Sequence, residues 1–190
     1  MAKFFPALEP HHRHYIAAQH MFFTASAAPT GHVNMSPRST DMFRVLGDNA
    51  VIYLDRTGSG NETAAHLKID SRLTIMFCAV AGPPLIMRLF GQGRVIHRDS
   101  AEFASLLQEH FAGKAPLGAR QMVRLDFDLV QTSCGYGVPL FEYQQERTQM
   151  DAWAKAKGVD GIESYWREKN EVSLDGFPTG LFETQRGTAP

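Results

Sequence analysis

The chain has 190 residues, of which 44% are hydrophobic and 21% are charged, so global intrinsic disorder is excluded. The 19 Lys and Arg residues are balanced by 20 Asp and Glu residues, and this formal charge of -1 disfavours nucleic-acid binding through counterion release. The richest apolar run, Leu73–Met87, contains two prolines and is shorter than the roughly 18 residues of a membrane span, so no membrane association is expected.

The N-terminal stretch MAKFFPALEPHHRH lacks the apolar core and small-residue cleavage site of a secretory signal, so a cytoplasmic location is expected. Cys78 and Cys134 form no C-x-x-C pair, and we expect two reduced thiols. Repeats and linkers are not evident. Residues 1–190 are therefore predicted to form a single domain with an N-terminal helix and a C-terminal helical extension.

Short runs rich in Val, Ile, Phe, Thr and Leu, bounded by Gly, Pro, Asn and Asp, predict seven strands. In chain order these are Met21–Ala25, His32–Ser36, Met42–Leu46, Ala50–Leu54, Leu73–Ala79, Leu85–His97 and Met122–Thr132. The stretch from Leu46 to Asn49 has hairpin-turn chemistry, because Gly and Asn tolerate a positive φ. The two strands that flank it are therefore expected to pair in antiparallel fashion.

Helical periodicity is clearest in Asp99–Phe111, where Asp99 and Glu102 are predicted to form a capping box. Two further helices are predicted at Gln145–Lys157 and Ile162–Lys169. Strands without regular alternation of strand and helix favour an antiparallel barrel or sandwich over a parallel sheet. The expected class is mainly β with peripheral helices (α+β).

The segment VIYLDRTGSGNETAAHL has a composition that suits an anion. A predicted strand leads through a Gly-Ser-Gly turn into a short helix that begins near Glu62, so that backbone N–H groups can converge. Arg56 can bind a phosphate in bidentate fashion, and Ser59, Asn61 and Thr63 can add hydrogen bonds. The alternative is a glycine-rich turn with Asn61 as an ordinary helix N-cap. The segment matches neither a Walker P-loop nor a complete Rossmann fingerprint.

Other polar residues are more ambiguous. Arg88 is a lone charge in an otherwise apolar strand, so its partner is expected to be a carboxylate, solvent or the polar edge of a ligand. Asn34 and Ser36 point to one side of a predicted strand and could contact a polar ring or face water. No metal site is expected, since a solvated helix face is the preferred interpretation of His11, His12 and His14.

Four stretches, HVNMSPRSTDMFRVL, VIYLDRTGSGNETAAHL, RLTIMFCAVAGPPLIMRLFGQGRVI and TSCGYGVPLFEY, together resemble the pyridoxamine 5'-phosphate oxidase-like proteins. The resemblance covers about residues 21–143. It implies an antiparallel split β-barrel of the FMN-binding type, a homodimer, and FMN bound at the subunit interface.

The resemblance also implies roles for individual residues. The flavin would lie along Asn34, Met35, Ser36, Arg38, Leu54 and Asp55. Its phosphate would be held by Arg56, Ser59, Asn61 and Thr63, and Arg88 would approach the polar edge of the ring system. Ser133, Cys134 and Tyr136 would close the pocket, and the partner subunit is one of the two chains that could supply them.

Two motifs of the vitamer oxidases are absent, an S-R-K segment at the phosphate site and a final R-L-x-P. The resemblance therefore implies FMN binding without implying vitamer oxidation. The expected function is an FMN-binding oxidoreductase with flavin-mediated hydride or electron transfer on an unidentified small molecule. The alternatives are a non-catalytic flavin-binding protein for storage or sensing, and a binder of haem or deazaflavin.

Overall fold

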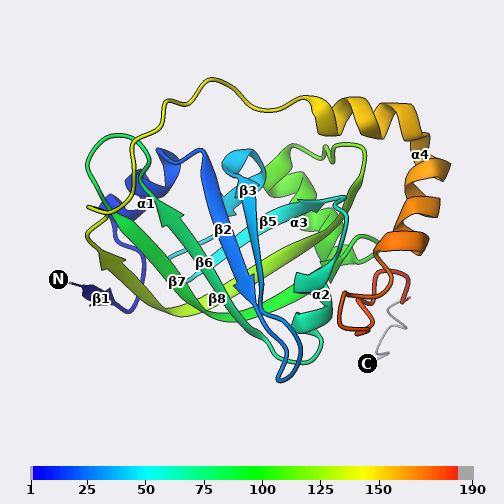
Figure 1. Ribbon diagram of the computed structural model, residues 1–190, viewed down its shortest axis with the longest axis horizontal. Helices are drawn as coiled ribbons and strands as arrows, with labels where there is room; N and C mark the ends of the chain where they lie inside the picture. The colour runs from blue at the N-terminus through cyan, green and yellow to red at the C-terminus, as the bar shows by residue number, and fades with distance from the viewer. Residues whose placement is uncertain (1, 184–190) are drawn as a thin grey trace.

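The structure is a computed structural model that describes residues 2–183. Its centre is one antiparallel sheet, in which neighbouring strands follow the order β3-β2-β6-β7-β8-β5-β4 and β1 pairs with β8. The strands are β1 (Lys3–Phe5), β2 (Met21–Ser26), β3 (Asn34–Ser39), β4 (Phe43–Val45), β5 (Ala50–Arg56), β6 (Arg72–Cys78), β7 (Ile86–His97) and β8 (Ala119–Ser133). The sheet curls into a half-barrel (Figure 1), which confirms the predicted class, mainly β with peripheral helices.

Alternating burial explains why these segments form strands. On β6 the side chains of Leu73, Ile75 and Phe77 are buried, whereas the residues between them are half-buried. This period of two gives the strand one face toward the core. The rings of Phe22, Phe43 and Phe77 lie with their centroids 4.9–5.9 Å apart, so β2, β4 and β6 meet inside the curled sheet.

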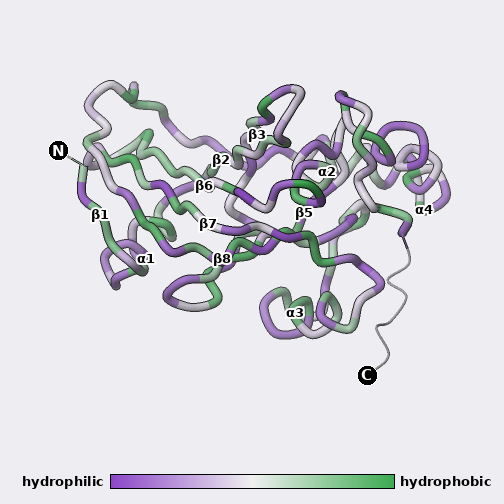
Figure 2. Tube along the Cα trace, turned by 90° about the horizontal axis from the view of Figure 1, so that it is seen from below, coloured by the Kyte–Doolittle hydropathy of each residue, from purple (hydrophilic) through white to green (hydrophobic). Residues whose placement is uncertain are grey.

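A second apolar cluster lies on the other side of the sheet, under α3 (Ala101–Phe111). Phe103 and Phe111 of this helix pack there with Ile52, Leu54 and other buried residues. Figure 2 shows α3 lying to one side of β5 and β8. The helix is capped by Ser100, whose Oγ accepts a hydrogen bond from the N–H of Phe103 at 3.1 Å.

The predicted capping box of α3 is therefore wrong. The N-cap is Ser100 and not Asp99, so Glu102 is one position short of the place that a capping box requires, and its side chain forms an ion pair with Arg94 on β7. The predicted hairpin is confirmed, since β4 pairs with β5 in antiparallel register and the N–H of Leu46 donates to the carbonyl of Ala50 at 2.9 Å.

The remaining α-helices are α1 (Pro10–Ala17), α2 (Glu62–Leu67) and α4 (Gln149–Lys169), and a short 3-10 helix, Thr40–Met42, joins β3 to β4. Figure 1 shows an extended stretch that crosses the molecule from the end of β8 to α4, which lies at the opposite end from α1. The two C-terminal helices predicted from sequence fall in α4, which begins at Gln149 rather than Gln145 and is kinked at Gly158 with φ 66°. No helix in residues 2–183 is long and apolar enough to cross a membrane.

Candidate functional site

A buried carboxylate organises the end of the half-barrel where β5 terminates. The Asp55 carboxylate accepts hydrogen bonds from Arg38 Nη1 at 2.5 Å, Arg120 Nε at 2.8 Å and Gln121 Nε2 at 2.9 Å. Burial raises the pKa of this carboxyl, but the guanidinium groups of Arg120 and Arg38 outweigh it, so the net pKa is lowered. Asp55 is therefore an ionised anchor between two arginines.

This geometry limits the contacts that Leu54 and Asp55 can make with a ligand. The side chain of Leu54 is 2% exposed and packs in the cluster under α3, on the other face of β5. That of Asp55 is 2% exposed and accepts hydrogen bonds from the three donors. A flavin placed along these two residues could meet only their backbone.

Residues 56–61, the last residue of β5 and the turn that follows it, are called the loop below, and they keep several hydrogen-bond donors without a protein partner. Asn61 accepts from Gln121 Nε2 through its Oδ1 at 2.8 Å, and its Nδ2 is buried with no partner among residues 2–183. Arg56 forms an ion pair with the exposed Asp151, and its Nε likewise has no partner in the described chain. Within the same residues no protein acceptor meets the N–H of Ser59 or of Gly60.

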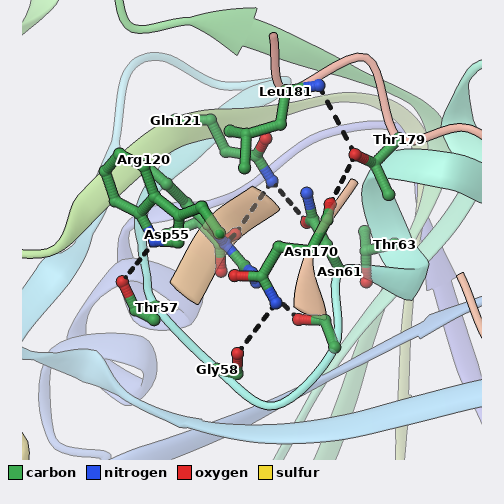
Figure 3. Close-up of polar contacts among 12 residues, drawn as sticks. Asp55, Thr57, Gly58, Asn61, Thr63, Arg120, Gln121, Asn170, Thr179 and Leu181 are labelled. Carbon is green, nitrogen blue, oxygen red and sulfur yellow. Dashed lines mark hydrogen bonds and ion pairs between the residues drawn. The ribbon is translucent and has the colours of Figure 1, made fainter. Parts of the chain in front are cut away.

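Asn61 occupies the N-cap position of α2, as the alternative interpretation expects. Its side chain makes no capping hydrogen bond, however, because its amide is turned toward Gln121. Figure 3 shows Asn61 and Gln121 close to Asp55 and Arg120, beside the loop that runs from Thr57 to Thr63. The loop is thus attached to the buried carboxylate through two polar side chains.

Strand β3 contributes polar side chains next to the loop and α2, as the sequence indicates. Asn34 Nδ2 donates to Thr63 Oγ1 at 3.2 Å, and Ser36 Oγ donates to Asn34 Oδ1 at 3.4 Å. Arg38 lies further along the same face. Met35, between them, is 65% exposed on the other face of β3. The structure thus brings β3 together with the loop and α2.

The other predicted site residues lie elsewhere. Arg88 is opposite Gln131 in the β7–β8 ladder, whereas Gln121 is opposite His97. At about 3.3 Å per residue, the two positions are roughly 30 Å apart along the strands. Arg88 lies 3.5 Å from Ser133 Oγ and has no carboxylate partner among the described residues. The exposed Cys134 and Tyr136 follow at the same end of β8, so within one chain these residues do not meet the loop.

Two hollows are found on the sheet, and neither includes the loop. One of about 390 Å³ lies between the β2–β3 connection and β6, with Ala25, Val33 and Phe90 in its wall. The other, of about 460 Å³, lies near the turn that joins β4 to β5.

Sequence reasoning missed Arg120 and Gln121, although both bind Asp55. They lie at the start of β8, ahead of the apolar run from which that strand was predicted to begin at Met122. The signal that could have found them is strand register, because Asp55 is directly opposite Gln121 in the β5–β8 pair.

Comparisons with known proteins agree with this architecture. A family model described as "Pyridoxamine 5'-phosphate oxidase" matches residues 8–134. The "Pyridoxamine 5'-phosphate oxidase family protein ustO" of Aspergillus flavus is 35% identical over 98% of this chain and 80% of its own length. The chain belongs to the pyridoxamine 5'-phosphate oxidase family. This family assignment confirms the resemblance drawn from the sequence motifs.

Solved structures show that the fold of this family member is shared by distant proteins. The HupZ protein of Group A Streptococcus is 14% identical, with a TM-score of 0.54 over 66% of this chain and 98% of that chain. A putative pyridoxamine 5'-phosphate oxidase from Lactobacillus delbrueckii is 16% identical, with a TM-score of 0.51 over 66% of this chain and 94% of that chain. At such identities the likeness concerns the split-barrel fold alone.

Proposed function

We propose that this protein is an FMN-binding oxidoreductase that transfers hydride or electrons to or from an unidentified small molecule. The observation that carries the proposal is the presence of two unpartnered buried donors on one loop, Arg56 Nε and Asn61 Nδ2, among the described residues. A buried donor without an acceptor costs about 1–3 kcal/mol, so native proteins rarely keep one that no ligand or water meets. A phosphate offers several acceptor oxygens at one point.

Each chain segment around the loop has a definite task in this proposal. Arg56, the Nδ2 of Asn61 and the N–H groups of Ser59 and Gly60 would hold the phosphate, while Asn34 and Ser36 would face the polar part of the ligand. Asp55 keeps the loop attached to the barrel through Gln121 and Asn61. A bound flavin supplies hydride or electron transfer, and the protein supplies binding and orientation. Because the phosphate segment lacks the S-R-K motif, vitamer oxidation is not part of the proposal.

We also propose a homodimer with the ligand at the subunit interface. Residues that lie opposite each other in a strand ladder share one face of the sheet. By this register the outer face carries four half-buried apolar side chains, those of Phe23, Met76, Phe90 and Leu129. A second copy would cover this face and could bring the Arg88 end of one chain to the loop of the other. Light scattering at micromolar concentration should return a dimer, and a monomer would contradict this part of the proposal.

The proposed cofactor is tested by the visible spectrum of the purified protein, with mass analysis of whatever is released on denaturation. We expect flavin absorption and the mass of FMN, either as purified or after incubation with FMN. A colourless protein that cannot be reconstituted would refute the proposal. Reduction by NADH or NADPH followed by reoxidation with oxygen would distinguish an enzyme from a flavin store.

A further inference from the structure

The C-terminal segment of the chain, residues 149–183, is built into the candidate site, although it lies beyond the family match at residues 8–134. We call this segment, which consists of α4 and the stretch after it, the C-terminal clasp. Polar contacts connect it to four of the seven residues from Arg56 to Glu62. These are Asp151 with Arg56, Trp166 Nε1 with Thr57 Oγ1 at 2.7 Å, Asn170 Nδ2 with the Gly58 carbonyl at 3.0 Å, and the Leu174 N–H with Glu62 at 3.1 Å.

Asn170 is the most tightly held of these residues. It is 0% exposed and follows the last turn of α4, where its N–H donates to the Trp166 carbonyl at 2.8 Å. Its own carbonyl accepts a hydrogen bond from Thr179 Oγ1 at 2.6 Å. Figure 3 shows Asn170 between Gly58 and Thr179. The backbone that carries the side chain donating to the loop is therefore held by hydrogen bonds to residues before and after it in the chain.

The contact with Gly58 determines which polar groups the loop presents. A carbonyl oxygen carries partial negative charge and repels an anion, whereas an N–H group attracts one. The carbonyl of Gly58 is bound by Asn170, and that of Gly60 is bound by Arg120 Nη1 at 2.9 Å. With both carbonyls held by donors, the N–H groups of the turn remain available to a ligand.

We propose that Asn170 and Trp166 are positioning residues that hold residues 56–62 in the conformation that binds the phosphate of the ligand. The clasp then controls affinity for the phosphate group without touching the ring system. This inference rests on the proposed function, because it assumes a phosphorylated flavin at the loop. It differs from that proposal in locating part of the phosphate affinity outside the barrel.

The test compares FMN with riboflavin, which has the same ring system and no phosphate, in calorimetric titrations of the full chain. Asn170→Ala removes the donor to Gly58, and we expect FMN affinity to fall about three- to tenfold while riboflavin affinity changes less than twofold. Trp166→Phe keeps an aromatic ring beside Arg98, whose Cζ lies 4.6 Å from the Trp166 ring centroid, and loses the N–H donor to Thr57 together with part of the indole ring. We expect a loss of about two- to fivefold, again confined to FMN.

Lys169→Ala is the matched control, since Lys169 precedes Asn170, is half exposed and pairs only with Glu168 in the described chain. It should leave both affinities unchanged. If the parent protein binds FMN no better than riboflavin, the phosphate site of the proposed function fails. If the parent prefers FMN and the variants keep that preference, or lose both ligands equally, the clasp does not position the loop. Should Asn170→Ala fail to fold, Trp166→Phe decides the question.

Discussion

Replacing Asp55 with asparagine should strongly destabilise the protein whether or not a ligand is bound. The side chains of Asp55 and Arg120 are 2% and 3% exposed, and that of Arg38 is 20% exposed. Removing one partner of a buried ion pair costs about 3–5 kcal/mol, because the remaining charge is left uncompensated. Arg38 stays partly exposed to solvent, and an asparagine oxygen still accepts one hydrogen bond. We therefore expect the free energy of unfolding to fall by about 3 kcal/mol, at the lower end of this range.

Urea denaturation provides the measurement. The urea concentration at the midpoint should fall, without a change in the slope of the unfolding free energy against urea. The melting temperature should drop by about 6–12 °C for a chain of this size. Asp160→Asn is the control, because Asp160 is exposed on α4 and has no ion pair among residues 2–183. Its effect should stay within about 0.5 kcal/mol. An equally small effect of Asp55→Asn would refute the reasoning.

The same ion cluster predicts a pH dependence. Because the pKa of Asp55 is lowered in the folded state, its contribution is fully present above the ordinary carboxyl pKa of about 3.8 and is lost as pH falls through the folded-state value. The parent protein should therefore lose stability on acidification more steeply than Asp55→Asn. If the free energy of unfolding fell equally steeply with decreasing pH in the two proteins, the lowered pKa of Asp55 would be contradicted.

Three further predictions concern other parts of the chain. Gly91→Ala should destabilise strongly, because a Cβ there would lie 2.1 Å from the Asp126 carbonyl oxygen, whereas Gly47→Ala, with nothing within 4 Å, should change stability by less than about 0.5 kcal/mol in urea denaturation. Thiol titration of the unfolded chain without reductant should find two thiols, and in the native protein the exposed Cys134 should react before Cys78, whose pKa is raised by burial. Asp151→Asn should raise FMN affinity about two- to fivefold in the same calorimetric titration by releasing Arg56 from an exposed ion pair.

Local sequence patterns account for most of the sheet. The alternation on β6 and the turn before β5 predict both strands and their class, because side-chain period and turn chemistry are local properties. Strand ends were less well predicted, since β3 and β5 run on to the polar residues Ser39 and Arg56. The short β1 was not predicted, as three residues carry no period and its pairing with β8 is a long-range contact.

The candidate site was only half visible in the sequence. Arg56 and Asn61 were found because glycines and polar residues follow a strand, a pattern that neighbouring residues reveal. The contacts of Asn170 and Arg120 with this loop were not predicted, since they join residues 112 and 60 positions apart, respectively. Such pairs depend on how the chain packs in three dimensions, and only the folded structure brings them together.

The central claim is that residues 56–61 bind the phosphate group of a flavin. Titrating Arg56→Leu with FMN and with riboflavin tests this claim most directly. Loss of a charge-assisted hydrogen bond should weaken FMN binding about ten- to a hundredfold and leave riboflavin binding nearly unchanged, at an unaltered melting temperature. Equal losses for both ligands, or no loss for either, would show that Arg56 does not bind the phosphate and would contradict the account.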